Sequence, residues 1–356
     1  MKIIFFCSSL GRGGAERVAV NLSEYFVSHG DDVSVITVKT DSEEYDVPSG
    51  VQRYNLDSGN KLIKIFELRK KLKELKYDLI ITMGVPNSVY VIPATRGLNY
   101  KVIVSERNDP TRFAGKKSTM IISRILMKKA DGCVFQTQIV KKLYEKMRIT
   151  GCVIKNPLSQ SIEKDMRKPA LKGDIIAVGR LSPQKNYELL LRAFREVIAI
   201  SPYEKLSIYG DGKQREELTE LVKHLGLEEN VRIHGNVKNV YDMELNAKLY
   251  VLTSSFEGIP NSLLEALAAG LPCVASDCRS GGCRELIESV DGGRVVRLED
   301  KKDTVDAMIY YIKHPKNEVD ANRQMKRTRE LYSIDRIGNE WLEYINEVIS
   351  GQKNFG

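Results

Sequence analysis

The stretch Lys2-Ile-Ile-Phe-Phe-Cys-Ser-Ser-Leu-Gly-Arg-Gly-Gly-Ala-Glu16 decides the fold. Residues Lys2–Cys7 are almost entirely apolar, which is typical of a strand buried on both faces of a parallel sheet. A glycine-rich turn follows, and apolar residues then recur at helical spacing over Ala15–His29. A strand that leads through a tight turn into a helix predicts the start of a βαβ unit.

The same alternation continues along the first half of the chain. Further strands are predicted at Val33–Lys39, Asp78–Met83, Lys101–Ser105, Gly132–Gln136 and Cys152–Lys155. Helical segments are predicted near 61–76, 117–130 and 138–147. The polar stretch Ser159–Gly173 then indicates a linker.

A second series follows the linker. Strands are predicted at Asp174–Val178, Leu206–Tyr209, Val231–His234, Leu249–Leu252, Pro272–Ala275 and Arg294–Val296, and helices at 186–200, 213–225, 261–269 and 301–313. We therefore expect an α/β chain with two parallel-sheet, Rossmann-like domains, 1–165 and 166–356, facing a cleft that holds the ligand. The last helix, about 333–350, has one apolar stripe and could cover either domain.

Composition excludes several protein classes. Of the 356 residues, 42% are hydrophobic and 29% are charged, which indicates a folded globular protein. No apolar run is long enough to span a membrane, and the apolar run at the start is too short for a signal peptide, so we expect a cytoplasmic protein. Six cysteines without a Cys-x-x-Cys pair, and four histidines, indicate buried thiols and no zinc site.

The positive charge is confined to the first half. Residues 1–165 carry 27 basic and 18 acidic residues, whereas residues 166–356 carry 28 and 29. The excess is clustered in Lys61–Lys76, Arg112–Lys129 and Lys141–Arg148. An anionic membrane surface, a nucleic acid or an ordinary solvated face would each account for such clusters. No aromatic-rich RNA-binding strand or helix-turn-helix pattern supports the nucleic-acid interpretation.

Two basic residues follow the first strand of the second domain, in Val178-Gly-Arg-Leu-Ser-Pro-Gln-Lys185. Arg180 and Lys185 precede a predicted helix, where the helix dipole disfavours cations. They could be ordinary surface charges, but a bound diphosphate would reverse the unfavourable electrostatics.

Two glutamates flank the loop Glu257-Gly-Ile-Pro-Asn-Ser-Leu-Leu-Glu265. Ser262-Leu-Leu-Glu265 has the spacing of a capping box, which would explain Glu265 without a ligand. It would not explain Glu257, and the helix start could also hold phosphate.

Two loops of the first half have weaker signals. Gly11-Arg-Gly-Gly-Ala-Glu16 could hold phosphate or be a simple tight turn, and it matches neither a dinucleotide fingerprint nor a Walker loop. Ser105-Glu-Arg-Asn-Asp-Pro110 follows a predicted strand and could contact substrate or be a solvated loop.

Together these motifs, with Tyr-Gly-Asp-Gly at 209–212 and His-Gly-Asn-Val at 234–237, resemble the retaining glycosyltransferases of family 4, which have the GT-B fold. The likeness spans nearly the whole chain, and the pattern EGIPNSLLEALAAGLP is its most specific part. The motifs GGAER and SERNDP resemble the subgroup that builds bacterial surface polysaccharides on lipid carriers.

The resemblance implies roles for individual residues. Arg180, Lys185 and Glu257 would be catalytic. The two cations would bind the diphosphate, and the carboxylate of Glu257 would contact the donor sugar. Glu265 would hold the ribose. The remaining residues implied on the donor side are Gly13, Gly14, Gly179, Gly210, His234, Val237, Asn261, Leu263 and Leu264, with the amides of the two leucines on the diphosphate and residues 234–237 facing the nucleobase.

On the acceptor side, the resemblance points to Glu106, Arg107 and Asn108. Many family members carry a histidine after this strand, where this sequence has Arg107.

The function implied is transfer of a hexose or N-acetylhexosamine from a UDP-sugar to a lipid-linked, polyprenyl-diphosphate type of acceptor, with retention and without a metal or other cofactor. The enzyme would sit peripherally on the inner face of the plasma membrane, through the basic first half, and would not bind nucleic acid. The alternatives are a UDP-sugar epimerase or hydrolase of the same fold and a nonenzymatic nucleic-acid-binding protein.

Overall fold

The apolar run at the start of the chain forms an interior strand of a parallel sheet. In the computed structural model, β1 (Lys2–Cys7) pairs with β2 (Asp32–Thr37) on one side and with β4 (Leu79–Met83) on the other. Ile3 and Phe5 enter the hydrophobic cluster on one face of the sheet, while Ile4 and Phe6 enter the cluster on the other. Because both faces are covered, successive residues of the strand are all apolar.

The structure describes residues 1–356 except 57–58, 113–116, 165–170, 238–239, 241–245 and 352–356. The chain divides into unit 1, residues 1–159 with 332–356, and unit 2, residues 160–331. The expected boundary at 165/166 falls outside the described residues. The last helix belongs to unit 1, which is one of the two placements that the sequence left open.

Within the described residues, the sheet of unit 1 has the strand order β3-β2-β1-β4-β5-β6-β7, with every pairing parallel. Its other strands are β3 (Gln52–Asn55), β5 (Lys101–Ser105), β6 (Gly132–Phe135) and β7 (Cys152–Val153). Its helices are α1 (Gly14–Ser28), α2 (Lys61–Leu75), α3 (Ser88–Thr95), α4 (Lys117–Met127), α5 (Gln138–Glu145) and α14 (Ile334–Ser350), with a 3₁₀ turn η1 (Val85–Asn87).

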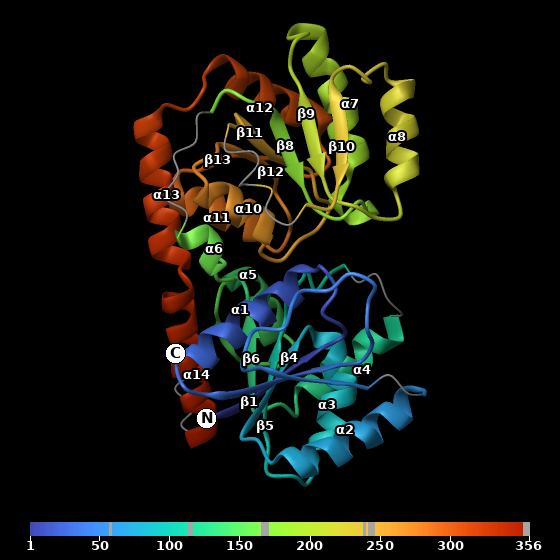
Figure 1. Ribbon diagram of the computed structural model, residues 1–356, viewed down its shortest axis with the longest axis vertical. Coiled ribbons are helices and arrows are strands. Elements are labelled where there is room, and N and C mark those ends of the chain that lie inside the picture. Colours follow the sequence, from blue (N-terminus) through green and yellow to red (C-terminus); the bar gives the residue numbers. More distant parts are fainter. Residues whose placement is uncertain (57–58, 113–116, 165–170, 238–239, 241–245, 352–356) are drawn as a thin grey trace. The chain divides into compact units, whose positions relative to one another are not determined.

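Unit 2 repeats the architecture. In its described part the strand order is β10-β9-β8-β11-β12-β13, again parallel throughout (Figure 1). The strands are β8 (Ile175–Val178), β9 (Leu206–Tyr209), β10 (Val231–Gly235), β11 (Leu249–Leu252), β12 (Cys273–Ser276) and β13 (Gly293–Val296). The helices are α6 (Gln160–Lys164), α7 (Tyr187–Ile200), α8 (Arg215–His224), α10 (Asn261–Ala268), α11 (Gly282–Val290), α12 (Lys301–Lys313) and α13 (Glu318–Tyr332), with η2 (Pro183–Lys185).

The predicted α/β class and both series of strands are therefore confirmed, but several elements were missed. Strand β3 has the polar sequence QRYN and is partly exposed, so it lacks an alternating pattern. Helix α3 contains Pro93 and is apolar on nearly all sides. Helices α11 and α13 were also missed. The predicted linker Ser159–Gly173 is wrong at its start, where Gln160–Lys164 forms α6, and residues 165–170 lie outside the described part.

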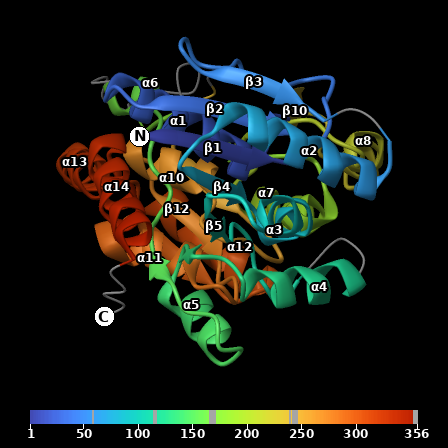
Figure 2. The same cartoon turned by 90° about the horizontal axis from the view of Figure 1, so that it is seen from below.

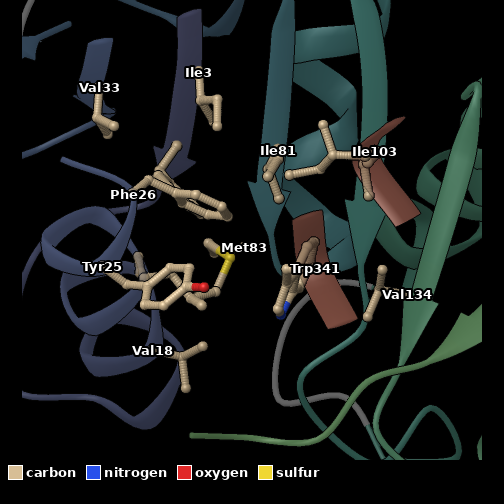
Figure 3. Close-up of a cluster of buried hydrophobic side chains, with 14 of the residues drawn as sticks. Ile3, Val18, Tyr25, Phe26, Val33, Ile81, Met83, Ile103, Val134 and Trp341 are labelled. Carbon is tan, nitrogen blue, oxygen red and sulfur yellow. The ribbon is translucent and has the colours of Figure 1, made fainter. Parts of the chain in front are cut away.

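The last helix completes the core of unit 1. The stripe Ile334, Ile337, Trp341, Ile345 and Val348 is buried with residues of β1, β4, β5 and α1. Helices α1 and α14 lie side by side (Figures 1 and 2). Figure 3 shows Trp341 among Met83, Ile103 and Val134. The sequence predicted this helix and its stripe, and the structure assigns the stripe to unit 1.

Gly338 allows α14 to approach α1 closely. A Cβ atom at residue 338 would lie 2.4 Å from Cε1 of Tyr25. The Tyr25 ring cannot yield easily, because it is 1% exposed and packs at a tilt against His29 with ring centroids 4.1 Å apart. Its hydroxyl also donates a 3.0 Å hydrogen bond to Asn339 Oδ1.

We expect Gly338→Ala to destabilise the protein. Replacing glycine by alanine in a helix normally gains up to about 1 kcal/mol, but forcing a methyl group into a packed contact costs about 1–3 kcal/mol. Thermal or urea unfolding should therefore show a lower free energy of unfolding for this variant. The control is Asn346→Ala, at an exposed position of the same helix, which should be neutral or stabilising. Equal gains in both variants would contradict the packing of Gly338 on Tyr25.

Candidate functional site

Two loops at the carboxyl edge of the sheet in unit 2 are held together by an ion pair. Lys185 Nζ lies 2.6 Å from Glu257 Oε1, and the side chains are only 16% and 9% exposed. Ser254 donates a further hydrogen bond of 2.8 Å to the same carboxylate oxygen. The structure thus brings together two residues that are 72 positions apart in sequence and that the sequence predicted to act together.

Backbone hydrogen bonds fix the same two loops. The amide of Ser255 donates to the carbonyl of Gln184 at 2.8 Å, and the Gln184 side chain donates to the carbonyl of Phe256 at 2.9 Å. Thr253 donates through its hydroxyl to the carbonyl of Asn186 at 3.0 Å. The sequence did not predict that Thr253 and Ser254 position Lys185 and Glu257.

The loop after β9 packs tightly against the loop that carries Arg180. A Cβ atom at residue 210 would lie 1.9 Å from the carbonyl oxygen of Gly179, so only glycine fits there. The amides of Gly179 and Leu181 donate to the carbonyls of Tyr209 and Asp211, each at 2.9 Å. The Arg180 side chain is exposed on this anchored backbone, where it is accessible to solvent.

Helix α10 begins differently from the prediction. Its N-cap is Pro260, and no side chain of the described residues caps it, so the predicted capping box is wrong. Ser262 lies inside the helix, and its hydroxyl accepts a 2.8 Å hydrogen bond from Tyr250. Because the helix starts directly after Pro260, Ser262 stands two residues too late to cap it.

The amides at the start of α10 are only partly available to an anion. The amide of Leu264 donates to the carbonyl of Pro260 at 3.1 Å, so it is engaged within the helix, and its role as a phosphate donor stays a prediction. The amide of Leu263 belongs to the first turn, where a helix offers no backbone acceptor for its N–H groups. Asn261 is half-buried, and Glu265 is 6% exposed in the same helix.

The residues predicted to face the nucleobase include a ring stack. His234 lies against Tyr209 with ring centroids 4.5 Å apart and an interplanar angle of 9°, and its Nε2 is 3.1 Å from Ser207 Oγ. His234 is exposed and Val237 is half-buried. The amide of Gly210 donates to the carbonyl of Gly235 at 2.7 Å, which ties this segment to the loop beside Arg180.

In unit 1, the Gly13–Gly14 turn leads into α1. Gly13 is the N-cap of this helix, and its own amide donates to the carbonyl of Gly11 at 2.6 Å. Gly13 is half-buried and Gly14 is exposed. Their predicted role at the donor phosphates stays a prediction.

Glu106 serves the fold of its loop. It is 4% exposed; its Oε1 accepts from the amides of Arg107 and Asn108 at 3.0 and 3.2 Å, and its Oε2 accepts from Tyr144 Oη at 2.5 Å. Burial raises the pKa of this carboxyl, and these hydrogen bonds oppose that effect. With both oxygens engaged, the carboxylate is poorly placed to meet an acceptor.

The neighbouring residues differ. Asn108 is exposed, whereas Arg107 is half-buried and donates from Nη1 to Asn156 Oδ1 at 2.9 Å. The Arg107 guanidinium lies over the Trp341 ring, 5.5 Å from its centroid. Burial lowers the pKa of this guanidinium to about 10, so it stays charged at neutral pH.

The cysteines show no reactive environment. Cys278 and Cys283 are fully buried near Glu257; a hydrogen bond to Cys278, together with burial, raises the pKa of Cys283 well above its usual range. A protonated, buried thiol is a poor nucleophile. Among the described residues, no group of three or more His, Cys, Asp or Glu side chains is placed to hold a metal ion. None of the described helices combines the length and the apolarity needed to cross a bilayer.

Two family models match this chain. Residues 159–329 match the model described as glycosyl transferases group 1, and residues 12–159 match the model described as glycosyltransferase family 4. The two matched segments correspond closely to unit 2 and to the first part of unit 1.

Relatives extend the likeness. The chain is 32% identical over 247 residues to the O-antigen biosynthesis glycosyltransferase WbnH of Escherichia coli, which covers 67% of this chain and 69% of WbnH. It is 27% identical over 366 residues to a Campylobacter jejuni α-1,4-N-acetylgalactosaminyltransferase that acts on a diphospho-undecaprenol-linked glycan, covering 98% and 99%.

Solved structures agree on the fold. The structure of Anabaena HepE in complex with UDP-glucose superposes with a TM-score of 0.82 at 19% identity, covering 98% of this chain and 100% of that one. The neighbours share the GT-B architecture of two Rossmann-like parallel-sheet units. Together with the site residues gathered in unit 2, these matches decide against a nonenzymatic protein, and the chain belongs to the group 1, family 4 glycosyltransferases.

Proposed function

We propose that this glycosyltransferase moves a hexose or an N-acetylhexosamine from a UDP-sugar to a hydroxyl of a lipid-linked glycan, with retention at the anomeric carbon. The observation that carries the proposal is the Lys185–Glu257 pair, which joins a cation for the diphosphate to a carboxylate for the sugar. The UDP-glucose complex of HepE supports the donor, and the diphospho-undecaprenol acceptor in the name of the C. jejuni relative supports the acceptor.

Lys185 and Glu257 would exchange partners when the donor binds. In the free protein each satisfies the other, which avoids an isolated charge at a mostly buried position. A diphosphate competes for Lys185 as a second anion. Glu257 then accepts hydrogen bonds from hydroxyl groups of the sugar, while Ser254 keeps its carboxylate in place.

The reaction breaks the bond between the anomeric carbon and the diphosphate oxygen, and the electron pair passes to UDP. Lys185, Arg180 and the amide of Leu263 would bind the growing negative charge more tightly than they bind the intact donor. The acceptor oxygen forms the new bond, and its proton passes to the departing diphosphate oxygen. No covalent enzyme intermediate is needed, and the two cations supply the charge that a metal would otherwise provide.

The test is a screen of UDP-sugars against lipid-diphosphate glycans, in the presence of EDTA. We expect one donor to release UDP only when an acceptor is present, and NMR of the product to show the anomeric configuration of the donor. Release of free sugar, or formation of an epimer, with donor alone would show a hydrolase or epimerase instead. Inversion in the product would overturn the retaining mechanism, and dependence on a divalent metal would overturn the metal-independent one.

A second part of the proposal concerns where the enzyme works. Helices α2 and α4 cover the same face of the sheet in unit 1 (Figure 2). Both helices expose large apolar side chains. Leu62 and Phe66 of α2 are 66% and 72% exposed; Ile121, Ile122 and Ile125 of α4 are 58%, 51% and 59% exposed.

Basic residues accompany these apolar side chains. Lys128 and Lys129 follow α4 and are exposed, and Lys61–Lys76 contains seven basic residues. Near an anionic bilayer each such charge contributes about 1 kcal/mol, and apolar side chains at the interface add to the affinity. We propose that this face of unit 1 holds the enzyme peripherally on the anionic, cytoplasmic side of the membrane. Residues 113–116 of the predicted basic stretch lie outside the described residues.

Flotation with liposomes checks the membrane contact. The full chain should float with vesicles that contain phosphatidylglycerol and much less with pure phosphatidylcholine. The triple variant Ile121→Ser, Ile122→Ser, Ile125→Ser should lose most of this binding. Its control is Ile200→Ser with Tyr203→Ser, which removes side chains that are 56% and 94% exposed in unit 2. Equal binding to vesicles with and without phosphatidylglycerol would contradict the proposal. An equal loss of binding in the α4 variant and in the control variant would contradict it as well.

A further inference from the structure

The contact between Arg107 and Trp341 concentrates buried hydrogen-bond donors that have no partner. Among the described residues, Arg107 Nε, Arg107 Nη2 and Trp341 Nε1 are all buried without an acceptor. Trp341 is 0% exposed, and the guanidinium lies 5.5 Å from the centroid of its ring. Buried donors are nearly always satisfied in folded proteins, so three in one contacting pair call for a specific explanation.

Within the described part of the chain, Arg107 also forms no ion pair that would compensate its charge. The adjacent carboxylate of Glu106 uses its two oxygens for the amides of Arg107 and Asn108 and for the Tyr144 hydroxyl. The guanidinium has only the neutral amide oxygen of Asn156 as a hydrogen-bond acceptor in the described structure. That oxygen also accepts from Gln136 Nε2 at 2.6 Å. The half-buried Arg107 cation therefore has one hydrogen-bond acceptor among the described residues, Asn156 Oδ1, which is uncharged and is shared with Gln136.

The position of the cluster is one where ligands bind. Arg107 follows β5, Gln136 follows β6 and Asn156 follows β7, so all three lie at the carboxyl ends of neighbouring parallel strands. Ligands of such sheets bind at this edge. Trp341 reaches the cluster from α14, and Figure 3 shows its ring nitrogen at the end of the ring away from Ile103.

We propose that Arg107 and Trp341 form a binding site for a phosphate group within unit 1. A guanidinium offers parallel N–H groups that match phosphate oxygens, and the indole N–H adds a third donor of fixed direction. Because the two guanidinium nitrogens are buried as the side chain lies, binding includes a small displacement of Arg107 from the Trp341 ring. Two sources of phosphate share this chemistry: the diphosphate of the lipid-linked acceptor, which rests on the proposed function, and free phosphate.

The protein reports on this site through its own fluorescence, because Trp341 is its single tryptophan. The full chain is titrated, without any sugar nucleotide, with inorganic phosphate and separately with farnesyl diphosphate. We expect a saturable change in emission with both probes and tighter binding of farnesyl diphosphate. Arg107→Gln should weaken binding at least about tenfold, because it removes the charge-assisted hydrogen bonds. Arg107→Lys should restore part of the affinity.

The control is Arg112→Gln, which removes an exposed charge from the same loop region and should leave binding unchanged. Thermal unfolding provides a second readout. A purely structural arginine would lose stability on conversion to glutamine, whereas a binding residue with unsatisfied donors should keep or raise the melting temperature.

The outcomes separate the possibilities. Unchanged affinity in Arg107→Gln, equal losses in Arg107→Gln and Arg112→Gln, or no saturable binding of either probe would overturn the site. A clear drop in melting temperature for Arg107→Gln would show that the cluster is structural. Equal affinity for the two probes, both lost in Arg107→Gln, would support the phosphate site and overturn the acceptor as its source. None of these measurements requires sugar transfer, so failure of the proposed function would be seen separately.

Discussion

The ion pair between Lys185 and Glu257 is the constraint on which the site in unit 2 depends. It connects the loop after β8 to the loop after β11, and the hydrogen bonds of Gln184, Ser254 and Ser255 follow from that connection. Because β8 and β11 are neighbours in a parallel sheet, their carboxyl ends bring the two loops to the same edge. The sheet supplies the proximity, and the pair fixes the geometry.

Such a pair is a costly way to stabilise a protein. Removing two charges from water is expensive, and their attraction repays this only with good geometry and additional hydrogen bonds. Apolar residues of similar size would often hold two loops as well. The arrangement makes sense where charge is needed for chemistry, because a lysine held in place by a carboxylate is already oriented when a diphosphate arrives. In the proposed mechanism, the oriented lysine would only have to exchange the Glu257 carboxylate for the diphosphate, which needs little movement of the two loops.

Much of the fold could be predicted from local sequence. Patterns that lie within a single strand or helix were enough for this. Examples are the apolar run of β1, the apolar run of each strand in the second series and the apolar stripe of α14. What could not be predicted required knowledge of tertiary neighbours. The partner of α14 depends on Gly338 fitting against Tyr25, and the contact of Arg107 with Trp341 joins residues from distant parts of the chain. The capping box failed because the helix begins after Pro260, two residues before Ser262.

The site was predicted to a similar extent. The resemblance to family 4 implied that Lys185 and Glu257 serve one donor site, and the structure shows that the loops carrying them follow neighbouring strands of the same sheet. The roles of Ser254 and Gln184 could not be read from the sequence, because serine and glutamine in a loop have many uses. Glu106 looked like a substrate contact by its position, but burial and three internal hydrogen bonds make it part of the loop's own structure.

In the proposed mechanism, Lys185 and Arg180 stabilise the negative charge that develops on the leaving diphosphate. The most direct measurement compares kcat with UDP affinity in Lys185→Gln, which retains a donor toward Glu257, and in Arg180→Ala, with Arg195→Ala on the exposed face of α7 as control. Each of the two variants should lower kcat by about 10²-fold, the effect of losing about 3 kcal/mol of transition-state stabilisation, while the Kd of UDP changes far less. Unchanged turnover in both variants, or a parallel loss of UDP affinity that accounts for the whole effect, would contradict the account.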